Sequence, residues 1–170
     1  MVDLYEAMST LRAVRRLKPD LIPAEVLGRV LQAAAWAPTG GNVQPFRIIA
    51  VQQPVLKQGL GALYHAEWHE YSKGHLAAMP GMREAAREQM AKMLKAGNYL
   101  ASHMAETPVI LVFCFNPDYM AITDSGLGRP SIVGGGSVYT AVQNVMLACR
   151  AEGLGCVLTT LLCQKEQAVK

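Results

Sequence analysis

Residues 37–46 read APTGGNVQPF, and this segment carries the strongest signal for the fold. It follows a run of apolar residues at helical spacing, which Pro38 is expected to end. Two glycines come next, so the backbone can approach a planar ligand closely. The amides of Asn42 and Gln44 could donate to and accept from the edge of a heterocycle, and Pro45 is expected to hold Gln44 in an extended conformation. Alone, the segment is equally compatible with an ordinary turn from helix to strand.

A basic stretch lies upstream, where residues 11–20 read LRAVRRLKPD. The forked guanidinium groups of Arg12 and Arg15 can each grip a phosphate through two hydrogen bonds. Arg16 and Lys18 belong to the same cluster, for which a solvated surface is the commoner explanation. The formal net charge of the chain is only +3, which does not indicate a nucleic-acid partner.

The remaining sequence alternates helical and strand patterns, which predicts an α+β domain with helices flanking a sheet. Asp3 is expected to cap a first short helix, and Pro23 to open a second. Ser137 is expected to cap a later helix, with Gly153 just past its end. Strands are expected at residues 47–51, 109–115 and 156–162. The second of them is apolar throughout and therefore predicts a strand buried on both faces.

Several common chemistries lack their sequence motifs here. No dinucleotide-binding glycine pattern follows a predicted strand, there is no P-loop, and no serine lies in a nucleophile elbow. His65 and His69 are four residues apart, but their pattern is not that of a zinc site, so we expect no bound metal. No apolar run is long enough to cross a bilayer and no signal peptide is evident, so we expect a cytoplasmic protein without a membrane partner.

The chain has four cysteines, and no two of them have C-x-x-C spacing. Without a secretory signal, reduced thiols are the expectation. Cys114 lies in an apolar strand pattern and Cys149 in an apolar helix pattern, so both are predicted to be small core residues.

Taken in order, these segments resemble the nitroreductase-like family of FMN-dependent oxidoreductases. That family shows a basic R-x-V-R stretch, an APSGGNxQPW loop, a helix carrying QNxxLAA, then GLG and a strand containing two threonines. Here the later motifs are residues 141–149, AVQNVMLAC, residues 153–155, GLG, and the pair Thr159-Thr160. The resemblance runs from about Leu4 to Leu162 and is weakest between residues 62 and 106.

The resemblance implies one FMN-binding domain over residues 1–170, with a mostly antiparallel central sheet flanked by helices in three α-β-α layers. It also implies a homodimer and a variable helical lid at about residues 62–106. The phosphate and ribityl end of FMN would contact Arg12, Arg15 and the backbone of Ala13. The implied residues around the isoalloxazine are Pro38, Thr39, Gly40, Asn42, Gln44, Thr159 and Thr160.

The implied reaction is hydride transfer from NADH or NADPH through FMN to a small organic acceptor such as a nitroaromatic or a quinone, with ping-pong kinetics. FMN would carry the chemistry, so no catalytic side chain is expected. The alternatives are a specialised relative, either a reductive dehalogenase or a flavin-cleaving enzyme, and a non-catalytic flavin-binding protein or flavin-free scaffold.

The chain departs from the family pattern at several positions. Thr39 replaces a serine and keeps the hydroxyl, Ala13 replaces a serine and loses it, and Phe46 replaces a tryptophan. Family members usually continue beyond Lys170 with a further basic phosphate contact and an arm that embraces the other subunit. That arm is expected to be absent from this chain.

Overall fold

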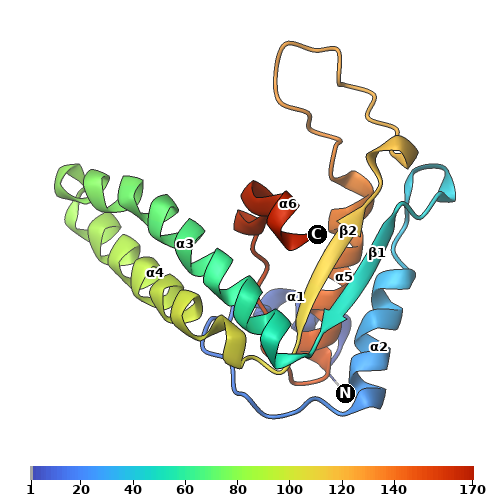
Figure 1. Cartoon of the computed structure of the whole chain (residues 1–170), viewed down its shortest axis with the longest axis horizontal. Coiled ribbons are helices and arrows are strands. Elements are labelled where there is room, and N and C mark those ends of the chain that lie inside the picture. The colour runs from blue at the N-terminus through green and yellow to red at the C-terminus, as the bar shows by residue number, and fades with distance from the viewer. Residues whose placement is uncertain (1) are drawn as a thin grey trace. The chain divides into compact units, whose positions relative to one another are not determined.

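The computed structural model describes residues 2–170 (Figure 1). Its α-helices are α1 (Leu4–Thr10), α2 (Ala24–Ala35), α3 (Pro54–Ala78), α4 (Glu84–His103), α5 (Gly136–Ala151) and α6 (Glu166–Val169). Its strands are β1 (Phe46–Val51) and β2 (Ile110–Phe115). Short 3-10 helices are η1 (Gly40–Asn42), η2 (Met79–Gly81), η3 (Met104–Glu106), η4 (Pro117–Tyr119) and η5 (Leu161–Lys165). None of the helices in residues 2–170 combines the length and apolar character needed to cross a membrane.

The chain folds into two compact units. Among the described residues, the first unit comprises residues 2–13 together with Leu21–Ala50 and Leu111–Cys156. The second unit comprises Val14–Asp20, Val51–Ile110 and Val157–Lys170. The prediction of a single FMN-binding domain over the whole chain stays a prediction.

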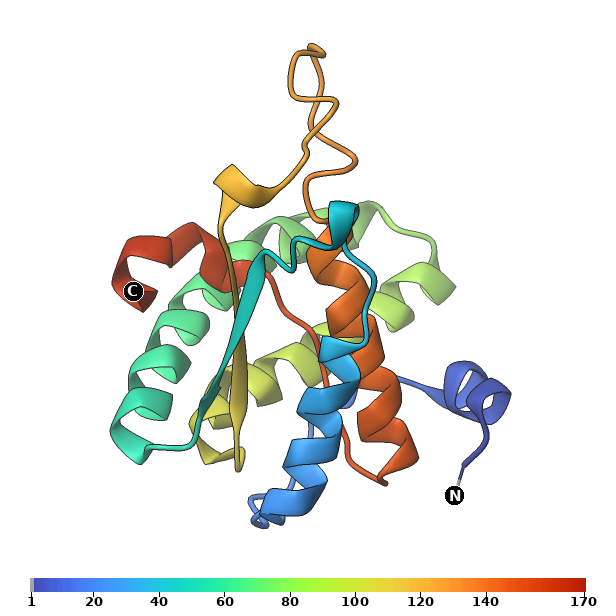
Figure 2. The ribbon, with the colours of Figure 1, turned by 90° about the vertical axis from the view of Figure 1, so that its right-hand side faces the viewer.

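The core of the first unit lies between α2 and α5, which run side by side in Figures 1 and 2. Ala34 and Ala141 are completely buried there, and small side chains at these positions let the two helices approach closely. Val30 and Val145 fill the space around them. The Asn144 amide donates to a backbone carbonyl of α2 at 3.0 Å, which satisfies a polar group in this apolar contact.

The helix boundaries in this unit follow their local signals. Asp3 accepts a hydrogen bond from the backbone N–H of Glu6 at 3.0 Å, as expected of the residue that caps α1. Pro23 directly precedes α2. Gly153 has a φ of 75° just past α5, where the chain reverses. These three predictions are confirmed.

The sheet is smaller and more exposed than the sequence predicted. In the described residues β1 and β2 form a two-stranded antiparallel sheet, which confirms the α+β class. The prediction that the second strand is buried on both faces is wrong at its end, where Cys114 is exposed and Phe115 is 52% exposed. Among residues 2–170, β1 is the only strand paired with β2, so no second neighbouring strand covers this end. Cys114 is therefore not a core residue, whereas Cys149 is buried as predicted.

The predicted third strand, residues 156–162, is also wrong. Cys156 forms a single parallel bridge with Ala13, and Leu161 already begins η5. A strand needs a partner along its length, and the segment around Ala13 provides one paired residue only.

The second unit is built on a hairpin of two long helices, α3 and α4 (Figure 1). The residues of α3 do not form one clear apolar face, so their sequence pattern alone does not define this helix. The ring of Trp68 packs directly against Gly97, and its indole N–H donates to Asn98 Oδ1 at 2.7 Å. The C-terminal η5 packs on α3, where Lys165 and Glu67 form an ion pair at 3.2 Å.

Candidate functional site

The loop between α2 and β1 has an unusual backbone. Gly41, Asn42 and Gln44 all have positive φ, at 58°, 55° and 47°. Non-glycine residues rarely adopt this conformation, and each costs on the order of 1–3 kcal/mol unless the surroundings fix it. The prediction that Pro45 keeps Gln44 extended is therefore wrong, because the hydrogen bonds of this loop override the preference of a residue before proline.

Helix α5 and the loop itself hold this backbone in place. Ser137 Oγ accepts the backbone N–H of Gly40 at 3.1 Å, and the Thr140 hydroxyl donates to the carbonyl of Pro38 at 3.1 Å. Thr39 Oγ1 accepts the backbone N–H of Gln44 at 3.0 Å. The prediction that Ser137 caps α5 is wrong, since the helix begins at Gly136 and the Ser137 hydroxyl binds the loop instead.

The loop presents its polar side chains to solvent. Pro38, Gly40, Asn42 and Gln44 are exposed, and Thr39 is half-buried. A shallow hollow of about 330 Å³ adjoins the loop, and its lining residues are Val43, Gln44, Pro45, Arg47, Cys114, Phe115, Asn116 and Tyr119. The structure thus brings all five predicted loop residues into one exposed, fixed surface.

The first part of the basic stretch lies at the end of α1. Arg12 Nη1 donates to the carbonyls of Ser9 and Leu11 at 2.9 and 2.7 Å, where it satisfies carbonyl groups that the helix leaves unpaired. Arg12 and Ala13 are both exposed. A phosphate at Arg12 would share the guanidinium with these carbonyls.

The other predicted residues belong to the second unit. Arg15 and Thr159 are half-buried and Thr160 is exposed. Tyr64 of α3 is 3% exposed, and burial raises the pKa of its hydroxyl, while a hydrogen bond with Thr159 and the charge of Arg15 act in the opposite direction. Arg15 and Thr159 therefore share Tyr64 as a neighbour. Tyr64 carried no sequence signal, because its role depends on a residue far along the chain.

Arg16 differs from its neighbours in the basic stretch. Its guanidinium lies 4.0 Å above the ring of Tyr99, and that ring stacks on His103 with centroids 4.0 Å apart. A guanidinium over an aromatic face is a favourable contact. Arg16 is thereby attached to α4, which favours a structural role over a ligand-binding one.

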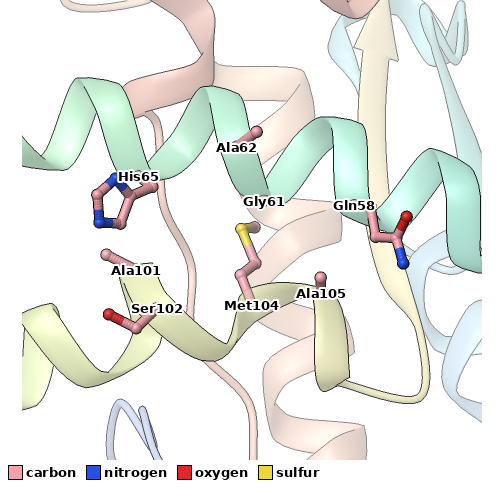
Figure 3. Close-up of a pocket in the computed structure, with 8 residues that line it drawn as sticks. All are labelled: Gln58, Gly61, Ala62, His65, Ala101, Ser102, Met104 and Ala105. Carbon is pink, nitrogen blue, oxygen red and sulfur yellow. The ribbon is translucent and has the colours of Figure 1, made fainter.

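A second hollow, of about 350 Å³, lies in the second unit and contains none of the predicted flavin residues (Figure 3). Its lining comes from α3 and from the end of α4 with η3, namely Gln58, Gly61, Ala62, His65, Ala101, Ser102, Met104 and Ala105. Most of these side chains are small. Among residues 2–170, no three histidine, cysteine or acidic side chains are grouped so that they could hold a metal ion.

The predicted flavin residues thus divide between the units. Arg12, Ala13 and the loop residues from Pro38 to Gln44 are in the first unit, and Arg15, Thr159 and Thr160 are in the second. The first unit offers a fixed loop with exposed amides, and the second offers a half-buried arginine and a half-buried threonine that share the buried Tyr64 as a neighbour.

Comparison with known proteins places the chain in a family. It is 29% identical to the 5,6-dimethylbenzimidazole synthase of Rhodobacter capsulatus over 161 residues, which cover 94% of this chain and 70% of that protein. It is 37% identical to an NADH dehydrogenase of Thermus thermophilus over 60 residues, 35% of this chain but only 29% of that protein.

The fold matches solved structures as well. A structure of oxidised iodotyrosine deiodinase bound to FMN and 3-iodo-L-tyrosine aligns with a TM-score of 0.67 and 24% identity, over 93% of this chain and 74% of that one. The sequence model of the nitroreductase family matches residues 10–168. The chain therefore belongs to the nitroreductase family.

Proposed function

We propose that this chain binds FMN and reduces a small organic acceptor, such as a nitroaromatic or a quinone, with NADH or NADPH as reductant. Membership of the nitroreductase family supports a flavin oxidoreductase. The observation that carries the FMN proposal is the loop from Pro38 to Gln44. Two of its non-glycine residues, Asn42 and Gln44, are held at positive φ while their amides stay exposed. Such strain in an exposed loop points to a function that needs this shape.

Each group of residues has a role in this proposal. Arg12 and Arg15 bind the phosphate and ribityl end, with the backbone of Ala13 beside Arg12. The loop residues border the isoalloxazine, and the amides of Asn42 and Gln44 pair with the polar edge of the ring. Thr159 and Thr160 are the remaining proposed contacts to the ring system. When bound, FMN supplies the hydride chemistry, so the chain needs only to bind and orient its ligands.

The kinetic form of the reaction follows from shared space. The nicotinamide and the acceptor would both stack on the one open face of the flavin, so the first product has to leave before the acceptor enters. Steady-state data should then give parallel double-reciprocal lines. Intersecting lines would require both molecules to bind at once and would overturn this part of the proposal.

A specialised activity is the second candidate. The match to 5,6-dimethylbenzimidazole synthase covers 94% of the chain, and the deiodinase structure has a TM-score of 0.67. Both resemblances favour a relative with a dedicated substrate, such as a reductive dehalogenase or a flavin-cleaving enzyme. In that case the α3–α4 hairpin, which contains the proposed lid at about residues 62–106, would set the choice of substrate.

The test is a titration followed by anaerobic reduction. The purified chain should bind FMN at micromolar concentration and more tightly than FAD, and NADH or NADPH should then bleach the flavin without an acceptor. Failure to bind either flavin refutes the proposal. If FMN binds but neither nicotinamide bleaches it, the proposed NAD(P)H-dependent activity is replaced by a specialised relative or by a non-catalytic flavin-binding protein. Turnover of iodotyrosine would indicate a specialised relative, and so would permanent loss of the flavin spectrum after reduction with dithionite and exposure to oxygen. A flavin that shows neither would indicate a non-catalytic binding protein.

We also propose that the protein is a homodimer. The first unit exposes large apolar side chains on and near its helices, with Tyr5 82%, Trp36 73%, Leu4 61% and Met8 55% exposed. Apolar groups of this size are commonly covered in an obligate interface. Light scattering should give twice the chain mass, and a monomer that keeps FMN and activity would contradict the proposal.

A further inference from the structure

Two thiols that the proposed flavin chemistry does not use lie together at the end of α5. Cys149 is in the last turns of the helix and is 7% exposed, and Cys156 follows soon after the helix ends and is half-buried. The backbone N–H of Leu154 donates to the Cys149 carbonyl at 2.8 Å, and Gly153 at positive φ completes the turn. This turn brings Cys156 back against the core cluster that contains Cys149.

The two thiols are not equivalent. The Cys149 thiol donates a hydrogen bond to Cys156, which lowers the pKa of Cys156. The same bond and burial raise the pKa of Cys149. In its protonated form, the Cys156 thiol donates to the carbonyl of Met146 at 3.8 Å. Cys156 is thus the partner that more readily becomes a nucleophilic thiolate, and Cys149 keeps its proton beside it.

We propose that Cys149 and Cys156 form a peroxide-sensitive dithiol that closes to an intramolecular disulfide. The Cys156 sulfur attacks hydrogen peroxide, so that an S–O bond forms and the O–O bond breaks. The released hydroxide takes up the thiol proton and leaves as water. The Cys149 sulfur then attacks the sulfenic acid at Cys156, so that the S–S bond forms and the S–O bond breaks, and the second water carries away the Cys149 proton. Peroxide is the only oxidant, and the proposal does not depend on FMN binding.

The other two cysteines provide a built-in comparison. Cys114 and Cys163 are both exposed, so either could react with peroxide simply because it is accessible. Neither belongs to the core cluster that brings Cys149 and Cys156 together. Exposed single thiols should therefore gain oxygen atoms or link two chains, whereas the dithiol should lose hydrogen.

The experiment uses the full chain carrying Cys114→Ser and Cys163→Ser, which leaves only the proposed pair. After treatment with about one equivalent of hydrogen peroxide, we expect both remaining thiols to disappear from a thiol count under denaturing conditions. The intact mass should fall by two hydrogen atoms, peptide mapping should join the two cysteines, and dithiothreitol should restore both thiols. A gain of oxygen mass without a disulfide, or two surviving thiols, would overturn the proposal.

Single variants test the order of the steps. With Cys149→Ser added, the Cys156 sulfenic acid should persist and react with dimedone. With Cys156→Ser added, Cys149 should stay reduced, because it is buried and keeps its proton. Equal dimedone labelling of the two variants would contradict the assigned roles. Because Cys149 is in the core, disulfide mapping in the unsubstituted chain gives a test that no folding defect can obscure.

Discussion

The hydroxyls of Ser137 and Thr140 are expected to control flavin affinity from α5, through the loop that they hold. Ser137→Ala removes the acceptor of the Gly40 N–H, and Thr140→Val removes the donor to the Pro38 carbonyl, at nearly constant volume. A neutral hydrogen bond contributes about 0.5–1.5 kcal/mol net, which corresponds to a factor of roughly 2 to 12 in an equilibrium constant. Each variant should weaken FMN by about this factor if the loop must be ordered to bind.

The two substitutions together should weaken FMN binding more than either alone. If the two bonds act independently, the FMN Kd should rise by about 5- to 150-fold. Fluorescence titration with FMN and with riboflavin measures it. Because the loop is proposed to border the isoalloxazine, which both ligands contain, the two affinities should fall by the same factor. The ratio of the riboflavin Kd to the FMN Kd should therefore stay constant, unlike after loss of a phosphate contact.

A matched control keeps the result interpretable. Ser125 is an exposed serine in the same unit, and Ser125→Ala should leave both affinities and the thermal midpoint unchanged. If Ser137→Ala and Thr140→Val keep both dissociation constants within twofold of the parent while the fold is intact, the loop does not limit flavin binding. Loss of FMN affinity with riboflavin unaffected would move the loop to the phosphate end.

Three further outcomes are expected. Arg12→Ala should weaken the binding of FMN by about 1.5–3 kcal/mol, as for a hydrogen bond to a charged group, and leave the binding of riboflavin unchanged in the same titration. Equal losses for the two ligands would mean that Arg12 only supports the end of α1. Gly97→Ala should lower the free energy of unfolding by about 1–3 kcal/mol, because the added methyl group collides with the indole ring of Trp68. Gly74→Ala, with open space around it in α3, should instead raise the free energy of unfolding by about 0.5–1 kcal/mol. A neutral Gly97→Ala would refute this packing. The backbone N–H of Ile132 and two side-chain donors lower the pKa of Asp124. The stabilising effect of Asp124 is therefore present above the ordinary aspartate pKa and is lost as the pH falls through the folded pKa. Asp124→Asn should flatten the acid side of a plot of thermal midpoint against pH, and an unchanged slope would contradict this prediction.

Local signals in the sequence predicted the helix boundaries of the first unit well. Asp3, Pro23 and Gly153 act within one turn of their own position, through a capping hydrogen bond, a fixed φ or a permitted positive φ. Such effects depend on neighbours in the sequence, so they can be predicted without knowing the fold.

Features that depend on distant partners could not be predicted in this way. Whether the end of β2 is buried depends on how many strands accompany it, and whether residues after Cys156 form a strand depends on the extent of pairing at Ala13. An apolar run gives the same pattern in both cases. Cys114 was therefore placed in the core by its sequence, although its strand leaves it exposed.

The candidate site shows the same division. The loop residues could be found from their motif, but the Ser137 hydroxyl that holds Gly40 lies 97 residues away along the chain. A serine near a helix start predicts a cap, and only the fold shows that its oxygen serves the loop instead. Tyr64 is a comparable case, because a buried tyrosine in α3 carries no sign of its contact with Thr159.

The contacts inside each unit also indicate how flavin binding and substrate choice could vary separately. The loop from Pro38 to Gln44 is fixed by α5 and by its own Thr39, all within the first unit. The α3–α4 hairpin is fixed within the second unit, by the packing of Trp68 on Gly97 and by Lys57, whose ammonium donates to the Thr107 carbonyl at 2.6 Å. Substitutions on the exposed face of the hairpin therefore leave intact the bonds that order the loop. This separation gives a physical reason for the expectation that the family motif is kept in the loop while residues 62–106 vary.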